Sequence, residues 1–315
     1  MEDILICGTG IYLQNIDSMK TLSFLDIKKQ EEFFFKPESV ISKKGLRYKD
    51  LATKFAICAA NKTLLDAGII SEPNQKINSS EIAIIVCSSL GNIDTIGKVM
   101  NIVKDNGVDE TSPLDLPNLS CNNIAASIAI WFNLTGTNLT VCNGSTSSLD
   151  ALQIGYNLLH LKKAKKALII GVEVSNEYTE LIKSTKDEEN VQVGAVGMLL
   201  SDYDQSKSYS SLPSLDVPLS CNSTLYNECG VIELISKSTA DLFIIPHEFC
   251  LRNNVMSLKR SKLSIDKCYG YMDGIYGILS SIYAISQLEK YKSICVIAGN
   301  NVEKYKCIMI KSITK

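Results

Sequence analysis

Short apolar runs that recur along the chain, with helical stretches between them, constrain the fold most strongly. Runs at 4–7, 82–87, 139–142 and 167–171 are apolar at nearly every position. A strand with one face in water would instead alternate between apolar and polar residues. Continuous apolar runs are typical of strands in a sheet that is covered on both faces. We therefore predict an α/β fold.

Two of the stretches between these runs predict helices. Residues 46–67 have helical periodicity, and Gly68 is placed to end that helix. Residues 145–161 predict a second helix, with leucines at helical spacing and hydroxyl side chains at its start.

A second series of the same kind occupies the rest of the chain. It comprises apolar runs at 197–200, 241–245, 294–297 and 307–310, with a helix at 273–289. Residues 202–224 are rich in Ser, Tyr, Asp and Pro, which favours a junction there. We predict two similar halves, 1–205 and 206–315, that form one structural unit.

Composition argues against several kinds of protein. A net charge of −2 and no apolar run long enough to span a bilayer give no sign of a nucleic-acid or membrane surface. Eleven cysteines without a CxxC pair, beside only two histidines, predict no zinc site. The N-terminus lacks the pattern of a signal peptide. We expect a reduced, cytoplasmic protein with buried cysteines.

Residues 136–152, GTNLTVCNGSTSSLDAL, resemble the nucleophile segment of β-ketoacyl synthases. In that family a cysteine stands at the turn from a strand into a helix, and Ser145 falls at this position. A helix N-terminus presents unpaired N–H groups and a positive dipole end, which stabilise a thiolate or an oxyanion.

Further segments resemble the family in the family's order. They are 86–94, 112–118, 164–174, 193–200, 241–247, 269–277 and 298–301. The resemblance places the first catalytic histidine at His247 and the second at Tyr271. It also places the family's lysine at Lys267, one residue from the formal position at Asp266, and the terminal Gly-Asn turn at Gly299 and Asn300.

The resemblance implies a thiolase-like fold, with two βαβαβ-type halves in five αβαβα layers and shortened cap loops. It implies no metal and no resident cofactor, because phosphopantetheine arrives on an acyl carrier protein. The departures matter for chemistry. A serine hydroxyl is a far weaker acid than a thiol with a pKa of about 8.5, and a tyrosine phenol with a pKa of about 10 does not replace an imidazole.

Two further departures fall after His247. Phe249 and Leu251 stand where the family has threonines that bind the pantetheine arm, in the tunnel region. These side chains cannot donate such hydrogen bonds.

Several residues have a structural and a functional interpretation. Ser145 is either an N-capping serine or an acyl-accepting nucleophile with His247 as its base. For Cys142 we expect buried packing, and for His160 a surface position. The basic run 162–166 is either a solvated face or a docking patch for an acidic carrier protein. Gly194 and Gly197 are expected to be packing glycines.

The missing catalytic groups predict a subunit of the chain-length-factor type. Such a subunit forms a heterodimer with an active β-ketoacyl synthase and shapes its acyl tunnel, with residues 113–130 near the shared interface. Two alternatives remain open. One is a Ser145–His247 acyltransferase or thioester hydrolase, and the other is a homodimeric binding protein.

Overall fold

The structure is a computed structural model, and it describes residues 4–14, 36–179, 193–202, 213–216, 226–252, 261–266, 272–300 and 304–312. Its strands are β1 (Ile4–Leu13), β2 (Ile82–Cys87), β3 (Asn138–Val141), β4 (Lys166–Glu173), β5 (Gly194–Asp202), β6 (Pro213–Asp216), β7 (Leu242–Ile244), β8 (Ser261–Leu263), β9 (Ser293–Asn300) and β10 (Lys304–Ser312). Its α-helices are α2 (Leu51–Asp66), α3 (Ile93–Asn106), α4 (Asn123–Phe132), α5 (Ser147–His160), α7 (Glu228–Lys237), α8 (His247–Arg252) and α10 (Tyr276–Ser286).

The ten strands lie in one mixed sheet whose two halves repeat one strand order. The order is β3-β2-β4-β5-β1 and then β6-β10-β9-β7-β8. Read from its outer edge to the centre of the sheet, each half therefore has its third, second, fourth, fifth and first strand in chain order. In the first half, β2 is parallel to β3 and β4, and β5 is antiparallel to β4 and β1. In the second half, β7 is parallel to β8 and β9, and β10 is antiparallel to β9 and β6. The antiparallel pairing of β1 with β6 joins the halves. The predicted boundary at residues 205 and 206 lies outside the described residues and stays a prediction.

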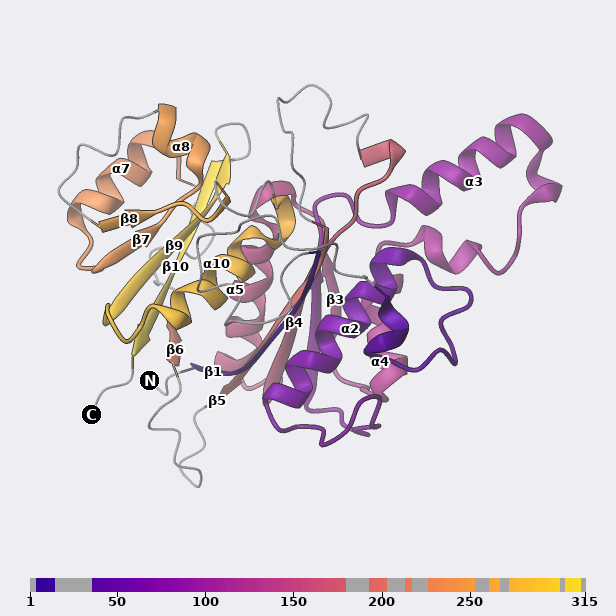
Figure 1. Ribbon diagram of the computed structural model, residues 1–315, viewed down its shortest axis with the longest axis horizontal. Helices are drawn as coiled ribbons and strands as arrows, with labels where there is room; N and C mark the ends of the chain where they lie inside the picture. The colour runs from indigo at the N-terminus through magenta and orange to yellow at the C-terminus, as the bar shows by residue number, and fades with distance from the viewer. Residues whose placement is uncertain are drawn as a thin grey trace.

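Helices cover both faces of the first half of the sheet (Figure 1). Successive side chains of a strand point to opposite faces. In β4, Leu168 and Ile170 therefore pack against α2 and α4, whereas Ile169 packs on the other face against α5 and α10. This confirms the expected sheet with two covered faces and explains why its strands are continuously apolar.

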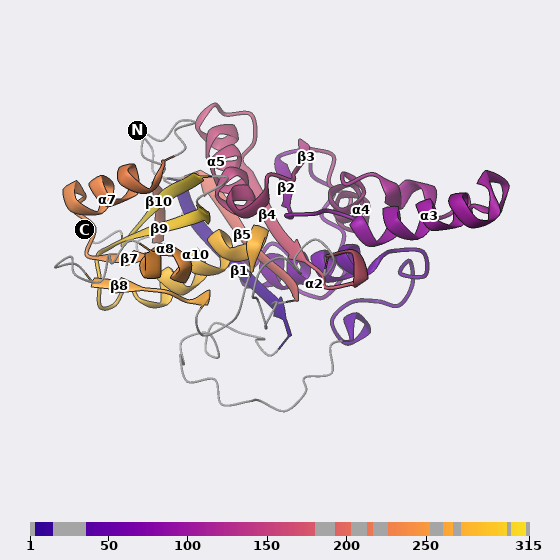
Figure 2. The ribbon, with the colours of Figure 1, turned by 90° about the horizontal axis from the view of Figure 1, so that it is seen from above.

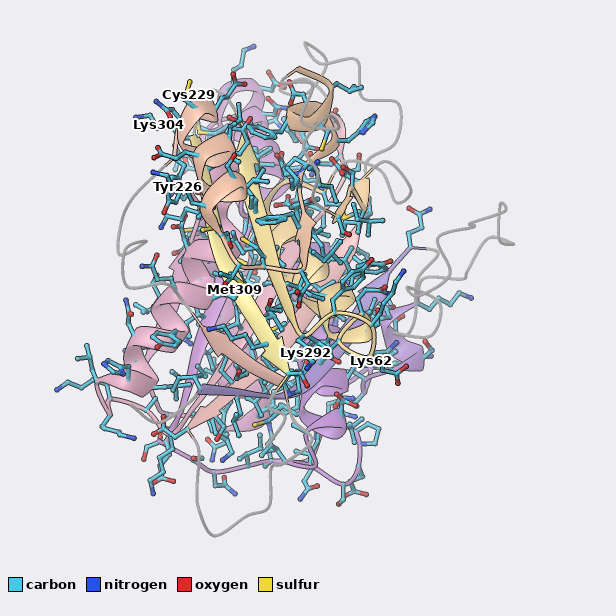
Figure 3. The ribbon with its side chains drawn as sticks, turned by 90° about the vertical axis from the view of Figure 1, so that its left-hand side faces the viewer. Lys62, Tyr226, Cys229, Lys292, Lys304 and Met309 are labelled. Atoms are coloured by element: carbon cyan, nitrogen blue, oxygen red, sulfur yellow. The ribbon has the colours of Figure 1, made fainter. Side chains whose placement is uncertain are left out.

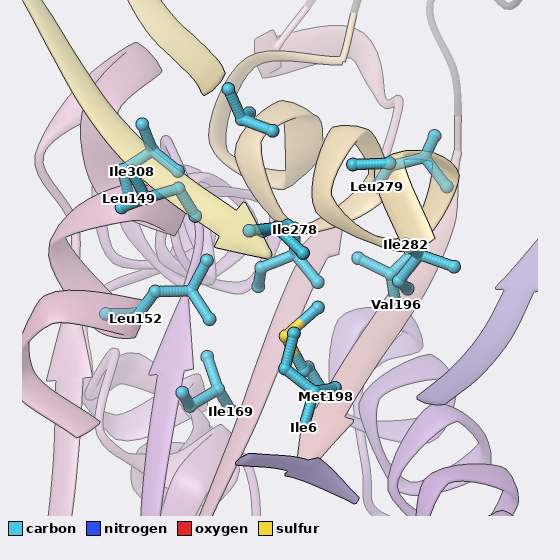
Figure 4. Packing of buried hydrophobic residues seen from close by; sticks show 14 of the residues in the cluster. Ile6, Leu149, Leu152, Ile169, Val196, Met198, Ile278, Leu279, Ile282 and Ile308 are labelled. Carbon is cyan, nitrogen blue, oxygen red and sulfur yellow. The ribbon is translucent and has the colours of Figure 1, made fainter. Parts of the chain in front are cut away.

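The middle layer is formed by α5 from the first half and α10 from the second. Figure 4 shows Leu149 and Leu152 of α5 facing Ile278 of α10, with Ile308 of β10 next to Leu149 and Val196 of β5 next to Ile282. Because one buried cluster takes side chains from both halves, neither half keeps its own inner core.

The outer face of the second half is covered by α7 and α8. The same alternation directs Phe243 and Ile297 outward, into a cluster with these helices. Backbone hydrogen bonds of 2.8 and 2.9 Å join Tyr226, just before α7, to Tyr305 of β10. Tyr226, Cys229 and Lys304 accordingly lie at one end of this face (Figure 3).

The sequence located most elements but not all of their bounds. The helix expected at 46–67 begins at Leu51, where Asp50 caps it by accepting a 2.7 Å hydrogen bond from the Thr53 N–H. The predicted junction at 202–224 contains β6, which the pattern did not indicate. Helix α3 projects away from the body (Figure 2). None of the helices described is long and apolar enough to span a bilayer.

Candidate functional site

The turn between β3 and α5 carries Ser145, as the sequence predicted. The chain leaves β3 at Val141, passes Gly144 in a left-handed conformation with φ of 64°, and forms the 3-10 helix η4 (Gly144–Thr146) directly before α5. Ser145 is 8% exposed and lies in the turn that immediately precedes α5. The N-cap position of α5 is Thr146, whose side chain makes no capping hydrogen bond, and the choice between a structural and a nucleophilic Ser145 stays open.

A network of buried polar groups fixes this turn. The Asp150 carboxylate accepts hydrogen bonds from Asn143 Nδ2 at 2.9 Å and from Thr146 Oγ1 at 2.8 Å. The other oxygen of the Asp150 carboxylate forms an ion pair with the ammonium group of Lys306. The Asp150 side chain is only 10% exposed and the Lys306 side chain only 15%. Asp150 lies on α5 and Lys306 on β10, so a buried ion pair ties the serine turn to the other half.

The corresponding turn of the second half faces the first. It is the 3-10 helix η7 (Asp273–Ile275), which precedes α10 and contacts η4. The buried carboxylate of Glu173 accepts hydrogen bonds from the N–H groups of Ser89 at 2.5 Å and Gly274 at 3.2 Å. Glu173 thus holds the ends of β2 and β4 against the start of α10.

His247 lies where the resemblance places it, as the first residue of α8 after β7. The side chain is half-buried, and the backbone N–H donates a 2.8 Å hydrogen bond to Asp266 Oδ2. Asp266, which stands at the family's formal lysine position, therefore caps the start of α8 with its carboxylate. Lys267 and Tyr271 lie outside the described residues, and the pairing of Ser145 with His247 stays a prediction.

The Gly-Asn turn lies at the end of β9, which contacts η4. Gly299 has φ of 133°, and a Cβ there would stand 2.1 Å from the carbonyl oxygen of Lys304. Only glycine fits such a conformation and so close a backbone approach. Asn300 pairs in register with Lys304 at the start of β10.

Phe249 and Leu251 have different surroundings. Phe249 is fully buried and makes an edge-to-face contact with Tyr305, with ring centroids 5.0 Å apart, in the outer core of the second half. Leu251 is 70% exposed. This packing gives Phe249 a structural role in holding α8 on β10, and a role of either residue in a tunnel stays a prediction.

Comparison with known proteins agrees with this geometry. The model of the β-ketoacyl synthase N-terminal domain matches residues 16–209, more than half of the chain. The chain belongs to the β-ketoacyl synthase family.

Curated relatives of this β-ketoacyl synthase family member match over part of their length. The 3-oxoacyl-[acyl-carrier-protein] synthase 2 of Vibrio cholerae is 29% identical over 115 residues, which are 36% of this chain and 27% of that protein. The enzyme of the same name from Vibrio harveyi is 27% identical over 134 residues, which are 42% of this chain and 31% of that protein. The matched region therefore spans less than a third of either relative.

Solved structures extend the likeness to the whole fold. The ishigamide ketosynthase/chain length factor has a TM-score of 0.76 at 13% identity and covers 99% of this chain and 100% of its own. A β-ketoacyl synthase from Burkholderia phymatum has a TM-score of 0.76 at 11% identity, with 99% of each chain covered. These matches confirm the predicted thiolase-like fold.

The expectation that Cys142 is buried in this β-ketoacyl synthase family member was wrong. We expected it to be packed inside a strand, but it follows the end of β3 and is exposed, because β3 is an edge strand that pairs only with β2. Its sulfur lies against Gly91 and Cys121. Local burial and the neighbouring Cys121 raise the pKa of the Cys142 thiol to about 11. A thiol this weakly acidic is a poor nucleophile at neutral pH.

Other expectations about single residues hold. His160 is the last residue of α5, exposed, and stacks on Tyr156. In the basic run, Lys162 pairs with Asp202 at 3.1 Å and Lys165 with Glu81 at 2.5 Å, and both the solvated face and the docking patch stay open. Gly197 is a packing glycine, because a Cβ there would stand 2.1 Å from Thr63 Oγ1.

Exposed large apolar side chains are concentrated in the stretch of chain from α3 to β3. Of the ten large apolar side chains that are exposed in the described part of the chain, six lie between residues 100 and 139. They are Met100, Val108, Leu114, Leu116, Ile130 and Leu139. They come from α3, the segment after it, α4 and β3 itself. We call these six residues the β3 surface. Three of the six, Leu114, Leu116 and Ile130, lie in the segment 113–130 that the sequence singled out.

Sequence reasoning missed the charged residues that hold the serine turn. Asp150 was read only as part of a helix, Lys306 precedes the apolar run at 307–310, and no signal in the sequence links the two. A charged residue inside an otherwise apolar element is the one available hint, because buried charges are found paired. The partner of such a residue becomes visible only in the fold.

Proposed function

We propose that this chain is a catalytically degenerate synthase subunit that pairs with an active β-ketoacyl-acyl-carrier-protein synthase and helps to shape its acyl tunnel. The serine at the nucleophile turn is the observation that carries the proposal. Condensation requires a thiolate that holds the acyl chain, and a hydroxyl at this position ionises too weakly to act without a close base. The active partner would supply the cysteine and both histidines.

The β3 surface supports pairing at this edge. An edge strand presents unpaired N–H and C=O groups, which favours the addition of a strand from another chain. Leu139 on β3 is 38% exposed and Ile130 on the adjacent α4 is 74% exposed. Exposed apolar side chains beside an open strand edge are typical of a protein interface. A symmetric partner of the same fold would offer a matching edge.

The solved structures supply the precedent. One of them is described as a ketosynthase/chain length factor, and another as a ketosynthase of a type II polyketide system in complex with an acyl carrier protein. At 13% and 12% identity these likenesses concern the fold. The pairing and the carrier protein are therefore part of the proposal for this chain.

Co-expression with a candidate synthase tests the pairing. We expect a one-to-one complex by size-exclusion chromatography with light scattering. The double variant Ile130→Asp with Leu139→Asp should weaken the complex at least tenfold, since a charge would be buried at its centre. Leu161→Asp is the matched control, because Leu161 is 64% exposed and lies away from β3, at the end of α5. A complex that the double variant leaves intact would rule out this interface.

One alternative has structural support of its own. Ser145 lies in the turn at the N-terminus of α5, where an oxyanion would be stabilised, so a Ser145–His247 acyltransferase or thioester hydrolase is compatible with the turn. Incubation with an acyl-carrier thioester and intact-mass measurement separates the two functions. A mass increase that Ser145→Ala abolishes favours the enzyme, and an unchanged mass favours the degenerate subunit.

A further inference from the structure

A pocket of about 750 Å³ lies outside the serine site, on the side of the sheet covered by α2. Its walls are the first turn of α2, the first turns of α3 and residues 174–178, which follow β4. Both α3 and this segment begin beyond the carboxyl ends of parallel strands, β2 and β4. Ligands of α/β proteins commonly bind at such strand ends.

Three polar atoms of the pocket wall are buried without a hydrogen-bond partner. They are Asp50 Oδ2, Asp94 Oδ1 and Asn176 Nδ2. Asp94 is only 8% exposed. An unpaired buried carboxylate oxygen is costly, so each such atom in a native protein calls for an explanation. A ligand that pairs with all three atoms must therefore donate hydrogen bonds to the two carboxylate oxygens and accept one from the amide nitrogen.

Asp50 and Asn176 each have an oxygen, Oδ1, that already accepts hydrogen bonds from the backbone. Asp50 Oδ1 caps α2 by accepting the Thr53 N–H at 2.7 Å. Asn176 Oδ1 accepts the N–H groups of Tyr178 and Thr179, both at 3.0 Å. The turn and the helix cap therefore hold the unpaired atoms in fixed positions. Burial raises the pKa of Asp50, and the charge of Asp94 adds to the increase.

Three basic residues, Arg47, Lys49 and Lys98, also line the wall, and the charge of Lys49 partly offsets the rise in the pKa of Asp50. Lys49 Nζ donates a 2.8 Å hydrogen bond to Ser127 Oγ on α4. The Arg47 guanidinium lies over the ring of Tyr48, 5.2 Å from its centroid. In the described part of the chain, neither Asp50 nor Asp94 belongs to a salt bridge.

We propose that this pocket binds a small molecule that carries a primary ammonium group next to a hydrogen-bond acceptor. The ammonium group lies between Asp50 and Asp94, and the acceptor faces Asn176 Nδ2. An ammonium group has three donors, which suits two carboxylate oxygens. The rings of Tyr48 and Tyr178 also line the pocket, and aromatic faces attract organic cations.

A metal ion fits the pocket less well. Ca²⁺ takes six to eight oxygen ligands, and Mg²⁺ requires octahedral coordination. Across the described ranges of the chain, no group of three or more His, Cys, Asp and Glu side chains is arranged to hold a metal. An organic cation needs only the two carboxylates. The site does not depend on the proposed function of the serine turn.

Calorimetry on the full chain, alone or in its synthase complex, tests the site. The probe is glycinamide, which has a primary ammonium group and a neighbouring carbonyl. We expect saturable binding with a Kd of about 1 mM or tighter. Tetramethylammonium, which has no N–H donor, and Mg²⁺ should not compete.

Two variants and one control decide the outcome. Asp94→Asn should weaken glycinamide binding at least tenfold. Asp50→Asn should do the same while keeping the α2 cap, since Asn also caps helices. Asp109→Asn removes an equal charge from the exposed 3-10 helix η2 (Val108–Glu110), outside the pocket, and should change nothing. The proposal is overturned if natively folded protein shows no saturable binding, if both pocket variants bind normally, or if Mg²⁺ displaces the probe.

Discussion

The two halves share one strand order but differ in what they present to solvent. The outer edge of the first half is β3, which lies within the β3 surface. The outer edge of the second half is β8, a three-residue strand, and Leu251 is the one large exposed apolar side chain described between residues 213 and 312. A short edge strand with few apolar neighbours resists pairing. Under the proposed pairing, the edge at β3 is therefore the one that associates, and the edge at β8 is not.

The halves depend on each other at their centre. Helices α5 and α10 share one core, and the buried Lys306–Asp150 pair crosses from β10 to α5. The difference between the halves thus concerns their edges and not their interiors. Substitutions at the centre should affect the stability of the whole molecule, whereas substitutions at the edges should affect association.

The largest effect is expected from the buried ion pair. Lys306→Ala leaves the Asp150 carboxylate buried without its partner, and the free energy of unfolding should fall by about 3 to 5 kcal/mol. The control is Lys162→Ala, which removes a surface pair with Asp202 within the first half and should cost at most about 1 kcal/mol. Urea denaturation of both variants measures the difference. Equal losses would mean that the central pair does not join the halves.

A smaller effect is expected where the two central helices touch. A Cβ on Gly277 of α10 would stand 2.5 Å from Leu149 Cδ2 and 2.6 Å from Ser148 Oγ of α5. Gly277→Ala should therefore cost about 1 to 3 kcal/mol through overpacking. Gly230→Ala makes the same change near the start of α7, where the nearest atoms are 3.2 Å away. It should change the midpoint of thermal unfolding little. A larger loss for Gly230→Ala would contradict the shared core.

Much of this architecture could be predicted from the sequence, because apolar runs report directly on buried strands. The run at 167–171 became β4, and the serine turn was located from its glycine, strand and hydroxyl residues. Strand β6 escaped detection, because its four residues, PSLD, carry no apolar run. The exposure of Cys142 could not be foreseen, because strand order, and not local pattern, decides which strand is at the edge.

The positions of single residues in the candidate site could be predicted from the sequence, but the contacts between those residues could not. His247 and Gly299 lie in the segments that the resemblance indicated. Asp150, Lys306 and Glu173 act through contacts between residues 84 to 156 positions apart. Such long-range pairs leave no local signal. The polar wall of Asp50, Asp94 and Asn176 is of the same kind, since three separate segments build it.

The smallest effect concerns thiol reactivity at the β3 edge. Because the pKa of Cys142 is about 11, its thiolate fraction near neutral pH is low, and it rises only as the pH approaches that value. Iodoacetamide should modify Cys142 about 100-fold more slowly than free cysteine at pH 8. Peptide mass spectrometry measures this, with exposed Cys229 of the second half as the internal control. Equal rates at the two cysteines would remove this contrast between the halves.

The most direct test of the account is a condensation assay with malonyl and acyl thioesters of a carrier protein. The chain alone should form no carbon–carbon bond. The complex with an active synthase should yield product, unaffected by Ser145→Ala in this chain and abolished when the partner's catalytic cysteine is replaced. Product from the isolated chain, or its loss from the complex upon Ser145→Ala, would contradict the degenerate-subunit account.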